Sequence, residues 1–267
     1  MSDNSASLRH LRLPVKESAT PRVLDAVATC AELRSFPFAD ADDTYFDLIA
    51  ESEFQPSDAP NASLLRIAQR CKKIERLALT NLVPDATVLA MLRTCSPLQL
   101  TDLDVSTELN GDFAAQFARL RSLRYLKLNL TGTSRYSARL LPLVESLPQI
   151  GELEKLALTV AEYDKMPARA TQMREIPLPA LKRLEWNIWF PPNLRAPELD
   201  YINIWCGMPD RDRMLRFLAH SPHIRAINLR SNGGVACKAL SEAEQISALL
   251  DDAGNCRWPN LYSFSAA

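Results

Sequence analysis

A short apolar phrase recurs along the chain. Residues 123–130 read LRYLKLNL, and their anchors Leu123, Leu126 and Leu128 follow the spacing L-x-x-L-x-L. Nine more triplets share this spacing, and most successive first anchors lie 18 to 30 residues apart, with two longer intervals of 41 and 37 residues. The ten first anchors are Leu8, Leu33, Ile74, Leu100, Leu123, Leu153, Leu181, Leu199, Ile224 and Leu261. Such a period predicts stacked units, each packed on its neighbours.

Each unit has a strand signal and, in most cases, a helix signal. Alternation around the last two anchors predicts a short strand with one buried face. Between triplets, apolar residues three and four positions apart predict helices. They are Val23, Val27 and Cys30; Leu64, Ile67 and Cys71; Val88, Leu89 and Leu92; Phe113, Phe117 and Leu120; Met214, Leu215 and Leu218; and Ile246, Leu249 and Leu250.

A strand and a helix repeated about every 20–29 residues form the leucine-rich-repeat (LRR) pattern. We therefore predict an α/β fold, an LRR solenoid of horseshoe form. Its parallel sheet would line the concave face and its helices the convex face. About ten irregular repeats would form a single array over residues 1–267.

Two intervals depart from the regular pattern. The polar, proline-containing stretch near residues 52–63 predicts an exposed loop inserted before a helix. The short repeat near residues 181–204 contains FPPNLRAPEL, whose adjacent prolines exclude an ordinary helix, so we expect an extended outer segment there. Residues 161–179 are weakly patterned and predict a further loop.

Composition and charge argue against several classes of function. The net charge of -1 gives no broad basic field, so we predict no nucleic-acid partner. No apolar run reaches the roughly 18 residues that would span a bilayer, so we predict no membrane partner. The first residues hold no uninterrupted apolar stretch, so we expect no secretory signal and a cytoplasmic or nuclear location. Six cysteines without a C-x-x-C pair predict reduced structural thiols.

We find no constellation that predicts catalysis. Glycine-rich nucleotide-binding motifs are absent, and His220 and His223 read as loop surface. Carboxylate pairs such as Asp251 and Asp252 are more typical of a solvated helix end than of a catalytic pair for general acid–base chemistry. We therefore predict a protein that is not an enzyme, with no cofactor and no metal site.

The remaining candidate is the concave face, where residues two, four and six after the first anchor point away from the core. We predict partner-binding residues Tyr125, Lys127, Asn129, Lys155, Arg183, Glu185, Tyr201, Asn203, Trp205, Asn228 and Arg230. Tyr125, Tyr201 and Trp205 stand out because interface hot spots favour aromatic residues and arginine. Two plainer interpretations stay open. Most of these residues would be a solvated surface, and Trp205 would merely cover the helix-free short repeat.

The array resembles the repeat part of F-box proteins, especially divergent fungal ones. The phrases LLRIAQRCKKIERLAL (64–79), RVLDAVATCAELRSF (22–36) and PPNLRAPELDYINI (191–204) carry the resemblance. It implies substrate recognition in a ubiquitin-ligase context. The Asn or Cys expected eight residues after the first anchor is matched only at Asn232. The F-box that docks the ligase adaptor has no room before Leu8, so we expect that this chain lacks it.

The predicted function is a non-catalytic scaffold that holds a protein partner on its concave face. Because repeats begin and end close to the termini, a partner could also cover the uncapped ends. The alternatives are a stand-alone inhibitor or sensor array, or a truncated gene product without an independent role.

Overall fold

The computed structural model describes residues 7–11, 20–38, 58–79, 83–96, 98–109, 112–130, 136–160, 175–187, 194–204, 220–229, 258, 261 and 263–266. They fall into two compact units, an N-terminal part (residues 1–133) and a C-terminal part (residues 134–267). The single array over residues 1–267 stays a prediction.

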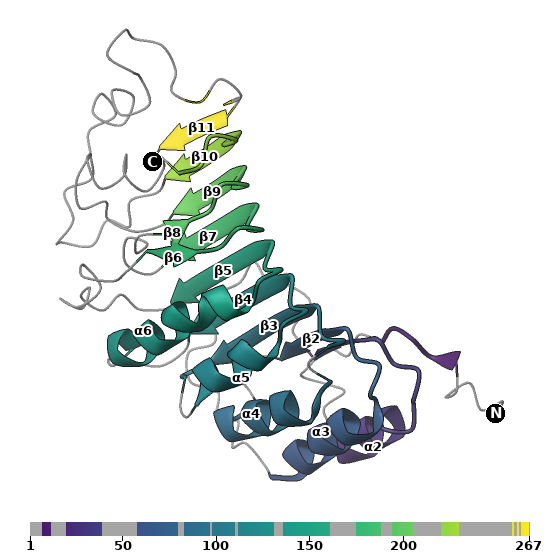
Figure 1. Cartoon of the computed structure of the whole chain (residues 1–267). Coiled ribbons are helices and arrows are strands. Elements are labelled where there is room, and N and C mark those ends of the chain that lie inside the picture. The colour runs from purple at the N-terminus through teal and green to yellow at the C-terminus, as the bar shows by residue number, and fades with distance from the viewer. Residues whose placement is uncertain are drawn as a thin grey trace, which may run out of the picture. The chain divides into compact units, whose positions relative to one another are not determined.

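The N-terminal part contains parallel strands joined by helices (Figure 1). Its strands are β1 (Ser35–Phe38), β2 (Arg76–Leu79), β3 (Asp102–Thr107) and β4 (Tyr125–Leu130), paired in sequence order. Its helices are α2 (Pro21–Val27), α3 (Asp58–Arg70), α4 (Asp85–Thr94) and α5 (Phe113–Arg119). The four helices predicted in this part are confirmed.

Local chemistry explains where these short helices begin. Thr20 caps α2 and Pro21 occupies its first position, where proline is well tolerated. The Asp112 carboxylate caps α5 by accepting a hydrogen bond from the Ala115 amide at 3.1 Å. Such helices are too short to be stable alone in water, so packing against the sheet and neighbouring helices must hold them.

One hydrogen-bond pattern joins each repeat to the next. In the N-terminal part, the amides of Glu75 and Arg76 both donate to the Arg34 carbonyl, and those of Thr101 and Asp102 both donate to the Glu75 carbonyl. The C-terminal part repeats it, since the Lys182 and Arg183 amides donate to the Glu154 carbonyl. The same backbone geometry thus recurs at the start of each strand, as a solenoid of equivalent units requires.

The C-terminal part begins with α6 (Tyr136–Ser146) and the 3₁₀-helix η2 (Leu147–Gln149). Its main sheet contains β5 (Lys155–Val160), β7 (Arg183–Asn187), β9 (Tyr201–Ile204), β10 (Ala226–Leu229) and β11 (Ser263–Ala266), paired in that order. All the pairings within each part are parallel. Each part therefore has the α/β architecture of leucine-rich repeats.

A small second sheet takes the place along the chain that helices take in other repeats. Strands β6 (Ile176–Pro177) and β8 (Leu194–Arg195) pair in parallel. Ile176 and Leu194 are buried, as are the nearby Leu178 and Ala196. The extended segment expected from FPPNLRAPEL contains β8, and residues 194–200 of the short repeat hold no helix.

The triplet anchors form the core. From Ile74 to Ile204, every described anchor of the six central triplets is at most 2% exposed. The anchors of the first and last triplets behave differently, because Leu8, Leu11 and Leu261 are only half-buried. Burial of the anchors is therefore most complete in the central triplets.

The structure differs from the sequence predictions at two helices. Residues 58–63, which we expected in the inserted loop, form the start of α3. Pro60 is compatible with a helix there because the first four amides of a helix have no intrahelical acceptor. Helix α6 was not predicted. The predicted helices around Met214 and Ile246 lie outside the described residues, as do residues 52–57 of the loop.

Candidate functional site

Each sheet has one face made of anchors and one made of the residues between them. We call the second the polar face. In the N-terminal part it carries Arg76, Asp102, Asp104, Ser106, Tyr125, Lys127 and Asn129. In the C-terminal part it carries Lys155, Thr159, Arg183, Glu185, Asn187, Tyr201, Asn203 and Asn228. Nine of the eleven site residues predicted from sequence therefore lie on the two polar faces.

The charges on the polar face of the N-terminal part are paired with one another. Lys127 Nζ lies 3.1 Å from Asp104 Oδ2, and the Asn129 amide donates to Asp104 Oδ1 at 3.3 Å. Arg76 Nε lies 3.6 Å from Asp102 Oδ2. Two predicted partner-binding residues are thus already bonded to Asp104, Lys127 by an ion pair and Asn129 by a hydrogen bond. A partner would have to replace these contacts to use them.

The polar face of the C-terminal part has a different arrangement of charge. Strand register places Lys155 on β5 directly opposite Arg183 on β7, and Arg183 directly opposite Tyr201 on β9. The Arg183 guanidinium carbon stands 4.7 Å from the centre of the Tyr201 ring, a cation–π contact. Lys155 and Arg183 are both exposed, whereas Tyr201 is half-buried. We call Lys155, Arg183 and Tyr201 the cationic row.

Within the described part of the chain, no carboxylate forms an ion pair with Lys155 or Arg183. Glu185, the next polar-face residue on β7, is exposed and likewise forms no ion pair with a described cation. Like charges directly opposite in a sheet are unfavourable, so this row has charge available for an outside group.

A second row lies beside the cationic row. Glu185 on β7 faces Asn203 on β9, which faces Asn228 on β10. The Asn228 side-chain oxygen is shielded from solvent and accepts no hydrogen bond within the described part of the chain. Glu185, Asn203 and Asn228 form what we call the acceptor row. Trp205 and Arg230, the remaining two predicted site residues, lie outside the described residues.

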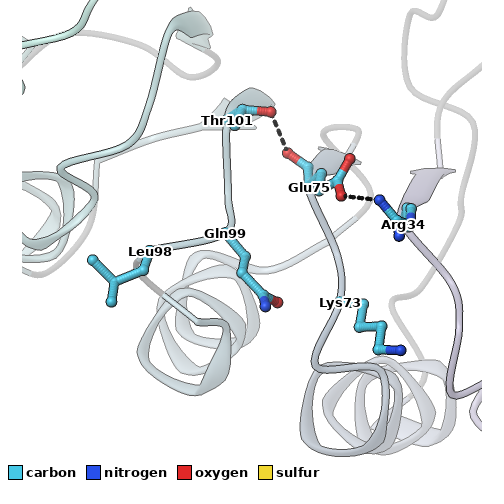
Figure 2. Close-up of a pocket in the computed structure, with 6 residues that line it drawn as sticks. All are labelled: Arg34, Lys73, Glu75, Leu98, Gln99 and Thr101. Atoms are coloured by element: carbon cyan, nitrogen blue, oxygen red, sulfur yellow. Dashed lines mark hydrogen bonds and ion pairs between the residues drawn. The ribbon is translucent and has the colours of Figure 1, made fainter.

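A hollow of about 400 Å³ in the N-terminal part was not predicted from sequence (Figure 2). It is lined by Arg34, Lys73, Glu75, Leu98, Gln99 and Thr101. Arg34, Glu75 and Thr101 each follow a first anchor directly, which is the sequence signal that could have located it. Leu98 is 74% exposed, the most exposed large apolar side chain described.

The charged groups around the hollow are already paired. Arg34 bonds Glu75 at 2.8 Å, and Lys73 bonds Glu32 at 2.5 Å. The hydrogen bond from Lys73 holds the pKa of Glu32 below its usual value. The hollow therefore offers less unused charge than the cationic row.

Three cysteines occupy equivalent positions in successive repeats, just after helices α2, α3 and α4. Cys30, Cys71 and Cys95 are buried, and no disulfide joins any two of them; their reduced state stays a prediction. Cys71 Sγ lies 3.8 Å from the Val27 carbonyl oxygen of the preceding repeat. Burial raises the pKa of both Cys71 and Cys95 to about 11. Such thiols are poor nucleophiles, because the thiolate is the reactive species.

Among the residues that the structure describes, no group of three or more His, Cys, Asp or Glu side chains is placed to hold a metal ion. None of their helices has the length and apolar character needed to cross a membrane.

Solved LRR structures are similar to this chain at low sequence identity. An LRR protein of Leptospira interrogans is 12% identical, with a TM-score of 0.41, over 98% of this chain and 67% of that protein. Internalin C2 of Listeria monocytogenes is 14% identical, with a TM-score of 0.33, over 78% of this chain and 76% of that one. No protein-family model and no curated protein matches the sequence. The assignment of the fold therefore depends on the parallel strands, the buried anchors and the repeated hydrogen bonds described above.

Proposed function

We propose that this protein is a non-catalytic scaffold that holds a protein partner on the polar face of its C-terminal part. One observation carries the proposal. Arg183 is stacked on Tyr201, beside Lys155, and the two cations have no carboxylate partner among the described residues. Arginine and tyrosine are enriched among residues that dominate binding energy at interfaces.

The stacked pair is also partly ordered before a partner arrives. Fixing a long, flexible side chain at an interface costs roughly 0.5–1.5 kcal/mol. Stacking on the Tyr201 ring restricts the Arg183 side chain in the free protein. A partner that contacts Arg183 would therefore lose less side-chain entropy than one that contacts an unrestrained arginine.

The polar face of the N-terminal part is the second candidate surface. Tyr125 is half-buried there, on β4 opposite Asp102 of β3. The commitment of Lys127 and Asn129 to Asp104 makes this face the weaker candidate, because a partner would first have to break the Lys127–Asp104 ion pair.

Affinity capture with quantitative mass spectrometry tests the proposal. The full chain serves as bait in three forms: unchanged, with Arg183→Ala and Tyr201→Ala together, and with the control substitution Arg76→Ala. Arg76 is 68% exposed and lies on the polar face of the N-terminal part. A partner should be enriched with the unchanged bait and the control, and lost with the double variant.

Two measurements complete the test. Circular dichroism should be the same for all three baits, since the substituted residues lie outside the buried core. The dissociation constant of the purified partner should rise by at least about thirtyfold for the double variant, equivalent to roughly 2 kcal/mol. Equal capture by the unchanged chain and the double variant would refute the proposed surface.

A finer form of this proposal is substrate recognition in an F-box-like, ubiquitin-ligase context, acting in the cytoplasm or nucleus. Its support is the sequence resemblance of residues 64–79, which form the end of α3, the following turn and β2. Co-purification of a ligase adaptor with the partner would favour this form. A single stoichiometric enzyme would favour an inhibitor, and no specific partner would favour a gene product without an independent role.

A further inference from the structure

We propose that the partner presents an extended segment in which an acidic side chain lies over the cationic row and a hydrogen-bond donor lies over the acceptor row. The inference depends on the proposed function and gives the chemistry of the segment that would bind. It predicts a short recognition pattern of Asp or Glu and, two residues away, Lys, Arg, Asn or Gln.

The cationic row determines the acidic position. Lys155 and Arg183 are register partners on neighbouring parallel strands, where opposed residues lie about 5 Å apart. A carboxylate has two oxygens and can accept bonds from both cations at once. It would also replace the repulsion between them with two attractions. Tyr201 completes the row, because its ring holds the Arg183 guanidinium through the cation–π contact.

The acceptor row determines the second position. Glu185 is an exposed carboxylate without an ion pair to a described residue, and the Asn228 side-chain oxygen lacks a donor within the described part of the chain. The Glu185 and Asn228 side-chain oxygens both accept hydrogen bonds, so neither favours an acidic side chain of the partner. A lysine, arginine or amide side chain over this row would donate a hydrogen bond to the exposed Glu185 carboxylate. A second carboxylate there would be repelled by Glu185.

The spacing follows from strand geometry. The two rows are separated by two residues along β7, from Arg183 to Glu185. Two residues of extended chain span about 6.6 Å. A partner segment in extended form has the same repeat between side chains on one face. The pattern therefore requires the acidic residue and the donor at positions i and i+2 of the segment.

The same charges argue against nucleic acid as the occupant. Phosphate-backbone binding requires a series of cations. On this face the described cations are Lys155 and Arg183, and Glu185 would repel the next phosphate in line. An acidic protein segment needs only one cationic site for its carboxylate, and its neighbouring side chain can donate a hydrogen bond to Glu185.

Selection from a displayed library of random 12-residue peptides tests the inference. The full chain is the bait, alongside Lys155→Glu and the matched control Arg76→Glu. Lys155 is exposed and its side chain forms no hydrogen bond or ion pair with a described residue, so reversing its charge should not disturb the fold. Arg76 is a comparably exposed cation on the polar face of the other part.

The unchanged chain and the control should both enrich peptides with Asp or Glu two residues from Lys, Arg, Asn or Gln. Lys155→Glu should lose that preference. For a synthetic peptide from the pool, Glu→Gln at the acidic position should weaken binding by about tenfold. Raising NaCl from 50 to 300 mM should weaken the parent peptide more than the Gln version, because exposed charges are screened.

Other outcomes separate this inference from the proposed function. Enriched peptides without an acidic residue, whose binding is lost in Tyr201→Ala, would overturn the inference and leave the proposed surface intact. Acidic peptides that bind Lys155→Glu as well as the unchanged chain would overturn the assignment to the cationic row. Failure of any peptide pool to enrich would count against both proposals.

Discussion

Lys127 and Asp104 are register partners on β4 and β3, and Lys127 Nζ lies 3.1 Å from Asp104 Oδ2. Their side chains are only 18% and 25% exposed. This pair is therefore less screened by water than Arg76 and Asp102, whose side chains are 68% and 34% exposed and whose atoms lie 3.6 Å apart. Two ion pairs on one sheet face thus differ in the free energy they should contribute.

We predict that Lys127→Met destabilises the protein by about 1–2 kcal/mol, because Asp104 is left partly buried without its cation. Urea unfolding followed by circular dichroism measures the change. The matched substitution Arg76→Met should cost less than about 0.5 kcal/mol, since exposed pairs contribute little. Equal effects of the two substitutions would show that burial does not distinguish the pairs.

The triplet anchors should dominate stability. Leu126 is fully buried. We predict that Leu126→Ala costs about 2–5 kcal/mol through lost burial and the cavity left behind. Tyr125→Ala, at the adjacent half-buried position, should cost less than half as much. Thermal unfolding of both variants tests the order, and a larger effect at Tyr125 would contradict the assignment of faces.

The period of the sequence was sufficient to predict the anchors and their strands. An anchor such as Leu103 contacts its own repeat and the next, so its burial is imposed by the spacing that the sequence displays. Helices α2 to α5 followed from the same local signal. These features depend on the order of residues within one repeat.

Helix α6 shows where a local signal was present but obscured. Leu140, Leu143, Val144 and Leu147 are buried and follow helical spacing. Pro142 interrupts that pattern, and proline inside a helix normally argues against one. Pro142 is exposed, and packing of the four apolar side chains outweighs its cost.

The charge arrangement on the polar faces could not be predicted in the same way. The sequence places Lys127 four residues after its first anchor and Lys155 two residues after its own, and both positions belong to the polar face. Whether each finds a carboxylate depends on the neighbouring strand, where Lys127 meets Asp104 and Lys155 meets Arg183. Cross-strand register decides this difference, and it connects residues more than 20 positions apart.

The cap of α5 gives a test of local structure. Asp112 accepts a hydrogen bond from the Ala115 amide at 3.1 Å, at the start of a seven-residue helix. We predict that Asp112→Ala costs about 0.5–2 kcal/mol and that Asp112→Asn restores most of this loss, since asparagine caps helices equally well. Chemical denaturation measures both. Similar losses in the two variants would indicate that the charge of Asp112, and not its capping bond, is what matters.

The buried thiols should make stability depend on alkaline pH. Burial raises the pKa of Cys71 and Cys95 from 9.0 to about 11 in the folded protein. Between pH 9 and 11 the unfolded chain ionises these thiols while the folded chain does not. Their contribution to stability is therefore complete below pH 9 and is lost as pH rises toward 11. Replacing Cys95 with Ala should reduce the decline over this interval.

Thiol reactivity gives an independent measurement of the same property. At pH 8 a thiol with a pKa of 11 holds about a hundredth of the thiolate of one with a pKa of 9.0. In a chain with Cys206, Cys237 and Cys256 changed to Ser, labelling by a disulfide reagent should be slow in buffer. It should be fast in guanidinium, where burial is lost. Rapid labelling of the folded variant would show that the Cys30, Cys71 and Cys95 positions open to solvent more readily than their burial implies.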